Sequence, residues 1–67
     1  MNWNEKEAIK DKLRNNLADF MIRHGEVHSD REKSNYYCSI RMVELTFHGE
    51  RFLITEVDGL TCRIEKQ

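Results

Sequence analysis

The stretch YYCSIRMVELTFHGERFLITEVDGLTCRIEK, residues 36–66, decides the fold. Apolar side chains recur in it at about every second position, which is the period of a β-strand. Two turn signals divide the stretch, His48-Gly49-Glu50 and Asp58-Gly59, and the second suits the type I′ turn of a two-residue hairpin. The stretch therefore predicts a three-stranded antiparallel β-meander.

Residues 4–24 predict one long amphipathic helix in front of this sheet. Asn4 and Glu7 have the spacing of a capping box, and Gly25 is suited to end the helix. We expect one stripe at helical spacing to dock on the sheet. This stripe consists of Ile9, Leu13, Leu17, Phe20, Met21 and His24.

Residues 25–35 are polar and charged, and Val27 is the only large apolar side chain among them. They predict a polar loop between the helix and the meander at 36–66. The chain, 1–67, is therefore expected to be a single α+β domain with one long N-terminal helix packed on a three-stranded antiparallel β-meander. A domain of this length buries only about 60% of the surface that its unfolded chain exposes, so its core is marginal.

Turn geometry predicts the strand register and thereby the two faces of the sheet. With two-residue turns, Leu45 lies opposite Phe52 in the first hairpin, and Thr55 lies opposite Cys62 in the second. One face then carries apolar side chains along nearly its whole length, and we expect the helix to dock there. That face consists of Tyr36, Cys38, Ile40, Met42, Leu53, Val57, Leu60, Cys62 and Ile64.

The opposite face is polar except for an apolar patch beside the first hairpin. Left uncovered, this patch would expose a few hundred Å², about the area that usually marks an interface. We interpret it as a partner-binding site, most simply that of a symmetric homodimer. The alternative is that the twisted hairpin bends over and buries these side chains in a single core. The patch consists of Val43, Leu45, Phe47, Phe52 and Ile54.

Charge and hydropathy exclude two classes of partner. The net charge of −1 argues against an indiscriminate nucleic-acid binder, which would carry a clear basic excess. The longest apolar runs, such as residues 52–54, fall far short of the roughly 20 residues that a membrane span needs. No signal region opens the chain. The sequence therefore predicts a cytoplasmic protein without a membrane partner.

Candidate chemistry is sparse. Cys38 and Cys62 fall on the two outer strands of the meander, about 10 Å apart, whereas a disulfide needs Cα atoms within about 7 Å. We therefore predict two free, buried thiols. His24 and His28 are separated by the helix end at Gly25, and the cysteines lack the short spacing of zinc modules, so no metal or cofactor is expected. With no nucleophile–base arrangement and no glycine-rich phosphate loop, we predict no enzyme.

These features favour a small non-enzymatic protein-binding module or regulator that forms a homodimer through the apolar patch. A second hypothesis is a weak single-stranded nucleic-acid-binding module, in which bases stack on sheet aromatics beside arginines. Acidic residues on the same strands, such as Glu44 and Glu56, would repel phosphate. The residues for this second hypothesis are Tyr36, Tyr37, Phe47, Phe52, Arg41, Arg51 and Arg63.

Overall fold

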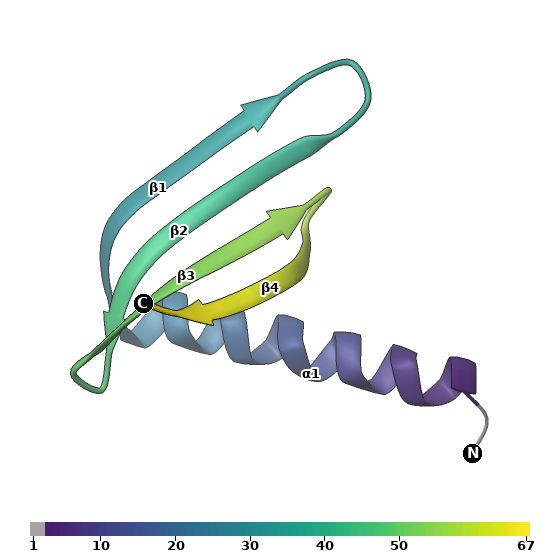
Figure 1. Ribbon diagram of the computed structural model, residues 1–67, viewed down its shortest axis with the longest axis horizontal. Helices are drawn as coiled ribbons and strands as arrows, with labels where there is room; N and C mark the ends of the chain where they lie inside the picture. The colour runs from purple at the N-terminus through teal and green to yellow at the C-terminus, as the bar shows by residue number, and fades with distance from the viewer. Residues whose placement is uncertain (1–2) are drawn as a thin grey trace.

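The computed structural model describes residues 3–67 and consists of one helix followed by a four-stranded antiparallel sheet (Figure 1). The strand order in the sheet is β1-β2-β3-β4, so each strand pairs with its neighbours in the chain. A helix packed on an antiparallel sheet is therefore confirmed, but the sheet has one strand more than predicted. The elements are α1 (Trp3–His24), β1 (Glu26–Ser34), β2 (Ser39–Phe47), β3 (Glu50–Val57) and β4 (Leu60–Lys66).

The additional strand is β1, and the prediction of a polar loop at 25–35 is wrong for this segment. The strand has no apolar period because polar cross-strand contacts attach it to β2. The His28 Nε2 atom lies 2.7 Å from the Thr46 hydroxyl, and the Ser34 hydroxyl donates a 3.0 Å hydrogen bond to the Ser39 hydroxyl. His28 and Ser34 thus find their partners on the neighbouring strand.

The two tight turns form as their residues predict. His48 and Asp58 have positive φ angles of 51° and 52°, followed by Gly49 and Gly59 at 77° and 82°. A type I′ turn requires positive φ at both of these central positions, and glycine adopts it at the second without steric cost. The predicted pairing of the first hairpin follows from this turn and is confirmed.

The second hairpin departs from the predicted register after its first residue pairs. A β-bulge places both Thr61 and Cys62 against Glu56, so Thr55 pairs with Arg63 and not with Cys62. An extra residue in one strand reverses the faces of the residues beyond it. Ile64 therefore joins the sheet face opposite to the one predicted for it.

The helix docks on the sheet face that we expected to remain open, so the prediction of the docking face is wrong. Once the bulge turns Ile64 inward, this face is apolar across three strands, whereas the opposite face is interrupted by charged residues such as Arg31 and Arg63. The helix thus covers the more continuous apolar surface. The buried core consists of Ala18, Met21, Val43, Leu45 and Ile54, with Ile22, Phe47, Phe52 and Ile64 packed around it.

Gly25 allows the chain to turn from the helix into β1 while lying close to β2. A Cβ atom at this position would stand 2.6 Å from the Met21 carbonyl oxygen and 2.9 Å from the Thr46 carbonyl oxygen. Real Cβ atoms do not approach backbone oxygens so closely, so any larger residue would push the helix end away from the sheet. Glycine therefore fixes the distance at which the C-terminal part of α1 meets the sheet.

Candidate functional site

The apolar patch predicted as a partner site lies in the core or against it. Val43, Leu45 and Ile54 are at most 1% exposed beneath α1. Phe47 and Phe52 are half-buried and pack around the same core. The expectation of an uncovered patch at these five residues is therefore wrong, and the burial alternative describes them correctly.

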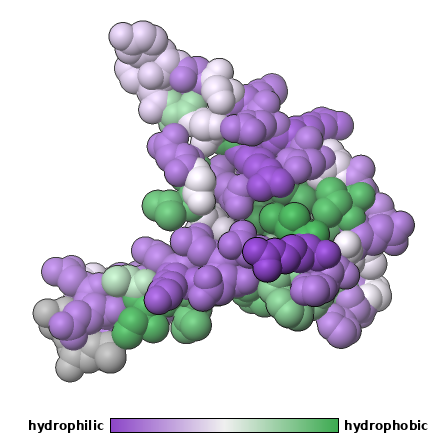
Figure 2. All heavy atoms as spheres, turned by 180° about the vertical axis from the view of Figure 1, so that it is seen from behind, coloured by the Kyte–Doolittle hydropathy of each residue, from purple (hydrophilic) through white to green (hydrophobic). Residues whose placement is uncertain are grey.

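Exposed large apolar side chains lie both on the sheet with its turns and on the helix, and those on the helix form a row. Ile9, Leu13, Leu17 and Phe20, which we name the outward stripe, are 44%, 61%, 50% and 52% exposed. In Figure 2, apolar side chains lie along α1 at the lower margin of the molecule, toward its N-terminal end. Of the stripe predicted to dock on the sheet, only Met21 is buried, so that prediction is largely wrong.

The outward stripe and the docked side of α1 point in nearly opposite directions. With 3.6 residues per turn, Ala18 lies about 140° around the helix axis from Leu13. Ala18 is fully buried against the sheet. Ile9, Leu13 and Leu17 therefore face away from the strands, while Phe20 meets the sheet at the Phe47 ring.

The N-terminal half of α1 extends beyond the sheet. Figure 1 shows the helix continuing past the β3–β4 turn toward the N-terminus. Beside this extension, α1 is joined to β4 by a 2.6 Å hydrogen bond from the Thr61 backbone N–H to the Asn15 side-chain oxygen. Ile9 and Leu13 thus stand on a part of the helix that extends past the sheet.

Phe20 lies at the junction between the outward stripe and the sheet. Its ring meets the Phe47 ring edge-on at 5.8 Å and lies 4.5 Å from the His24 ring. These contacts leave half of the Phe20 side chain exposed. The stripe is therefore continuous with the partly buried aromatic group at the end of β2.

Charges are unevenly distributed along α1. The first turn carries the acidic residue Glu5, and the last turn carries the basic residues Arg23 and His24. This distribution complements the helix dipole, whose N-terminal end is positive.

The surface area of the chain is larger than that of a compact monomer of its size. The accessible surface is 5349 Å², whereas a folded monomer of this mass exposes about 4,500 Å². The radius of gyration is 12.9 Å, against about 11 Å for a compact domain of this length. The excess of about 850 Å² is close to the roughly 800 Å² that one subunit buries in an interface of standard size.

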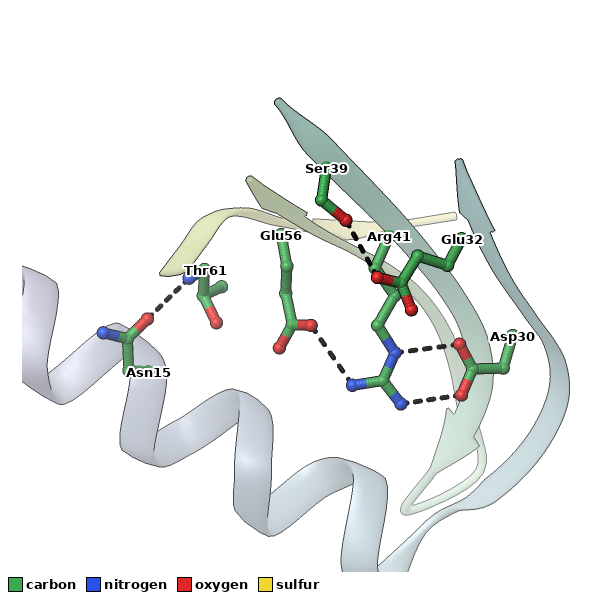
Figure 3. Close-up of polar contacts among 7 residues, drawn as sticks. All are labelled: Asn15, Asp30, Glu32, Ser39, Arg41, Glu56 and Thr61. Atoms are coloured by element: carbon green, nitrogen blue, oxygen red, sulfur yellow. Dashed lines mark hydrogen bonds and ion pairs between the residues drawn. The ribbon is translucent and has the colours of Figure 1, made fainter. Parts of the chain in front are cut away.

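A polar cluster occupies the helix side of the sheet beyond the apolar core. The Arg41 guanidinium donates hydrogen bonds of 2.8 and 2.6 Å to the two Asp30 carboxylate oxygens and one of 3.2 Å to Glu56 (Figure 3). In the register of the first hairpin, Arg41 lies directly opposite Glu56. Glu56 is only 8% exposed, so Arg41 supplies the charge that balances a buried carboxylate.

These hydrogen bonds also set the ionisation of the cluster. The hydrogen bonds from Arg41 hold the pKa of the Asp30 carboxyl below its ordinary value, although burial acts in the opposite direction. Hydrogen bonds to Asp30 and Glu56 likewise raise the pKa of Arg41. The cluster is therefore a stable set of ion pairs that joins β1, β2 and β3.

Residues proposed for single-stranded nucleic acid do not form one surface. Arg41 is held by two carboxylates, and Arg63 donates a 3.3 Å hydrogen bond to Glu65. Tyr36 and Tyr37 are 95% and 90% exposed in the β1–β2 turn, and Arg51 is exposed on β3. The partly buried aromatic residues Phe47 and Phe52 lie on the helix side of the sheet.

Cysteines and potential metal ligands are dispersed. Cys38 and Cys62 are free thiols, as predicted, but Cys38 is half-buried and Cys62 is exposed, so their predicted burial is wrong. Within residues 3–67, no group of three or more His, Cys, Asp or Glu side chains is placed to hold a metal ion. In the same range, no helix combines the length and apolar character that a membrane crossing requires.

Comparison with known proteins finds no matching family model, no matching curated protein and no matching solved structure. The outward stripe of α1 is the candidate functional site that the geometry itself supplies. Sequence reasoning identified its residues but assigned them to the core. The missed signal was the small residue Ala18, which lies on the side of the helix that can approach a sheet most closely.

Proposed function

We propose that this protein is a small non-enzymatic protein-binding module that forms a homodimer through the outward stripe of α1. The observation that carries the proposal is the direction of the stripe. Ile9, Leu13, Leu17 and Phe20 are each 44% or more exposed, and the first three face away from the strands. Solvent-facing rows of large apolar side chains on a helix usually mark a helix-in-groove or helix-pair interface.

A second copy of the chain fits this surface in both shape and charge. Two helices that cross antiparallel about a two-fold axis place Ile9 opposite Phe20 of the second copy and bring Leu13 beside Leu17. The same arrangement puts Glu5 of one copy near Arg23 and His24 of the other. Opposed helix dipoles and opposite charges both favour this antiparallel pairing.

The area of the chain supports the same stoichiometry. A homodimer interface of standard size would remove about 800 Å² from each subunit, which brings the chain close to the surface expected of a compact domain. The marginal core of a 67-residue domain gains stability from such an interface. Self-association is thus a role that the stripe can perform without any other component.

Sedimentation equilibrium over a range of protein concentrations tests this proposal. We expect the wild-type chain to be a dimer at micromolar concentration and Leu17→Lys to be a monomer, because the change places a charge in the apolar contact. Leu60→Lys is the matched control: Leu60 is 63% exposed on the opposite side of the sheet, and its replacement should leave the dimer intact. A strictly monomeric wild-type chain would overturn the proposal.

A further inference from the structure

One edge of the sheet, the margin formed by β1, is not covered by α1. The outermost strands are β1 and β4, and α1 packs against β4 more closely than against any other strand. β1 is nine residues long and is exposed along its whole length except at the half-buried Ser29. An open margin presents backbone N–H and C=O groups that can pair with a further strand.

Acidic and basic residues alternate along residues 30–33 of β1, so the acidic ones lie on the helix side of the sheet and the basic ones on the opposite face. On the helix side, Asp30 is bound by Arg41, and Glu32 accepts a 2.8 Å hydrogen bond from the Ser39 hydroxyl. On the opposite face, the side chains of Arg31 and Lys33 form no hydrogen bond or ion pair with the described part of the chain. Asp30 and Glu32 are therefore satisfied, while Arg31 and Lys33 are available.

The two cations stand over an apolar hollow. Arg31 lies opposite Met42 and Lys33 lies opposite Ile40 in the β1–β2 register. Together these four side chains line a hollow of about 300 Å³ on the outer face. Positive charge above an aliphatic floor suits the side chain of a glutamate, which has an apolar stem and a charged end.

A second copy of β1 is a poor occupant of the same margin. In an antiparallel pairing about a two-fold axis, opposite residues project their side chains from the same face of the sheet. Arg31 would then meet Arg31 or Lys33 of the other copy, and Asp30 would meet Asp30 or Glu32. Like charges placed directly opposite destabilise a strand pair, so this margin disfavours self-pairing.

We propose that β1 binds an extended acidic peptide segment of another protein, which adds a fifth strand to the sheet. Backbone pairing with residues 29–34 supplies affinity, and acidic side chains at alternate positions of the segment lie beside Arg31 and Lys33 on the outer face. Strand addition of this kind takes its specificity from alternate side chains of the added segment. The site is separate from the outward stripe, so a homodimer carries two of them.

Titration of the full chain with labelled synthetic peptides tests the proposal. The probe is a short peptide in which glutamate and valine alternate, followed by fluorescence anisotropy and by the amide NMR signals of the protein. We expect binding at about 50 mM NaCl that weakens at about 500 mM NaCl, because exposed charges are screened. Shifted amide signals should concentrate at residues 29–34. A peptide that alternates glutamate with proline carries the same charge but lacks a backbone N–H at every second residue and is a poor strand former, so it should bind far more weakly.

Charge reversal at the two cations separates this proposal from its rivals. Arg31→Glu combined with Lys33→Glu should weaken binding by about tenfold or more, while Lys12→Glu on α1 should change little. Circular dichroism and sedimentation of the double variant should remain those of the wild-type chain. Equal binding of the proline peptide, unchanged binding by the double variant, or tighter binding of an oligo-dT strand than of the acidic peptide would each overturn the proposal.

Discussion

The two sides of α1 differ in the size of their apolar side chains, and the side with the row of large ones is not the side that packs on the sheet. The side that meets the sheet carries Ala18, Met21 and the half-buried Ile22, whereas the side that faces solvent carries Leu13 and Leu17 among its larger apolar residues. The docked side is the one on which a small residue permits close approach of the helix to the strands. An apolar stripe therefore shows that a surface is to be covered, but not which surface covers it.

The largest predicted loss of stability comes from a change in the core beneath the docked side of α1. Leu45→Ala should lower the free energy of unfolding by about 3 kcal/mol, because the leucine is 1% exposed and its removal leaves a cavity. Leu13→Ala is the matched change on the outward stripe, where the side chain is 61% exposed in the isolated subunit. Urea denaturation measures both variants.

At low protein concentration, where dimers dissociate, Leu13→Ala should shift the urea midpoint far less than Leu45→Ala. At high concentration its effect should grow, since the wild-type interface then contributes to stability by mass action. Equal losses for the two variants at low concentration would contradict the assignment of Leu13 to the solvent-facing side.

The second predicted loss of stability concerns the close approach of the C-terminal end of α1 to β2. Gly25→Ala should destabilise the fold by about 2 kcal/mol, because the new Cβ atom would overlap the Met21 and Thr46 carbonyl oxygens. Alanine at the exposed turn position Gly49 serves as a control with a different mechanism, since only its positive φ is strained there. Thermal unfolding of both variants, with near-ultraviolet circular dichroism of the aromatic residues, measures the change. An unshifted melting temperature for Gly25→Ala would show that the helix end is not held so close to β2.

The third effect lies on the same side of the sheet, beyond the end of the apolar core. Arg41→Met should cost about 2 kcal/mol of stability, because Glu56 then remains buried without a balancing cation. Adding Glu56→Gln to Arg41→Met should restore part of the loss. A double-mutant cycle in urea measures the coupling, and additive losses would contradict the pairing.

The smallest effect is a dependence of stability on pH. The Asp30 pKa lies below its ordinary value of 3.8 in the folded chain, so the unfolded chain binds the proton first as pH falls. The contribution of the Arg41–Asp30 pair is therefore complete above that ordinary value and is lost at lower pH. Since both side chains are partly exposed, we expect at most about 1 kcal/mol.

Urea midpoints measured between neutral pH and pH 2 should show this loss in the wild-type chain. Asp30→Asn should start less stable at neutral pH and should lose correspondingly less stability on acidification. An identical acid profile for the two proteins would contradict a specific role for Asp30.

Local chemistry was sufficient to predict the helix, both tight turns and the register of the first hairpin. Asp58-Gly59 fixes the second turn because aspartate and glycine both tolerate the positive φ angles that the two central positions require. The pairing of Arg41 with Glu56 follows from the first turn by counting residues. These features depend on neighbours in sequence or on a single hairpin, so the sequence suffices for them.

Features that depend on packing between distant elements could not be predicted in this way. The bulge at Cys62 reverses the face of Ile64, and no turn residue signals it. β1 is held by polar contacts with β2, so it lacks the alternating apolar pattern by which strands are recognised. The candidate site moved for the same reason: α1 covers the sheet face that carries the predicted patch, and it does so with the side that carries Ala18, which leaves the outward stripe exposed.

Pulsed electron spin resonance between identical nitroxide labels tests the central claim that two copies pair through the outward stripe in antiparallel orientation. Single labels would be attached to Asn16→Cys and to Asn4→Cys in a background that lacks Cys38 and Cys62. At 1.5 Å of rise per residue, we predict a short distance between subunits for Asn16→Cys and a separation larger by about 30 Å along the helix axis for Asn4→Cys. Short distances at both positions, or no dipolar coupling between subunits at micromolar concentration, would contradict the account.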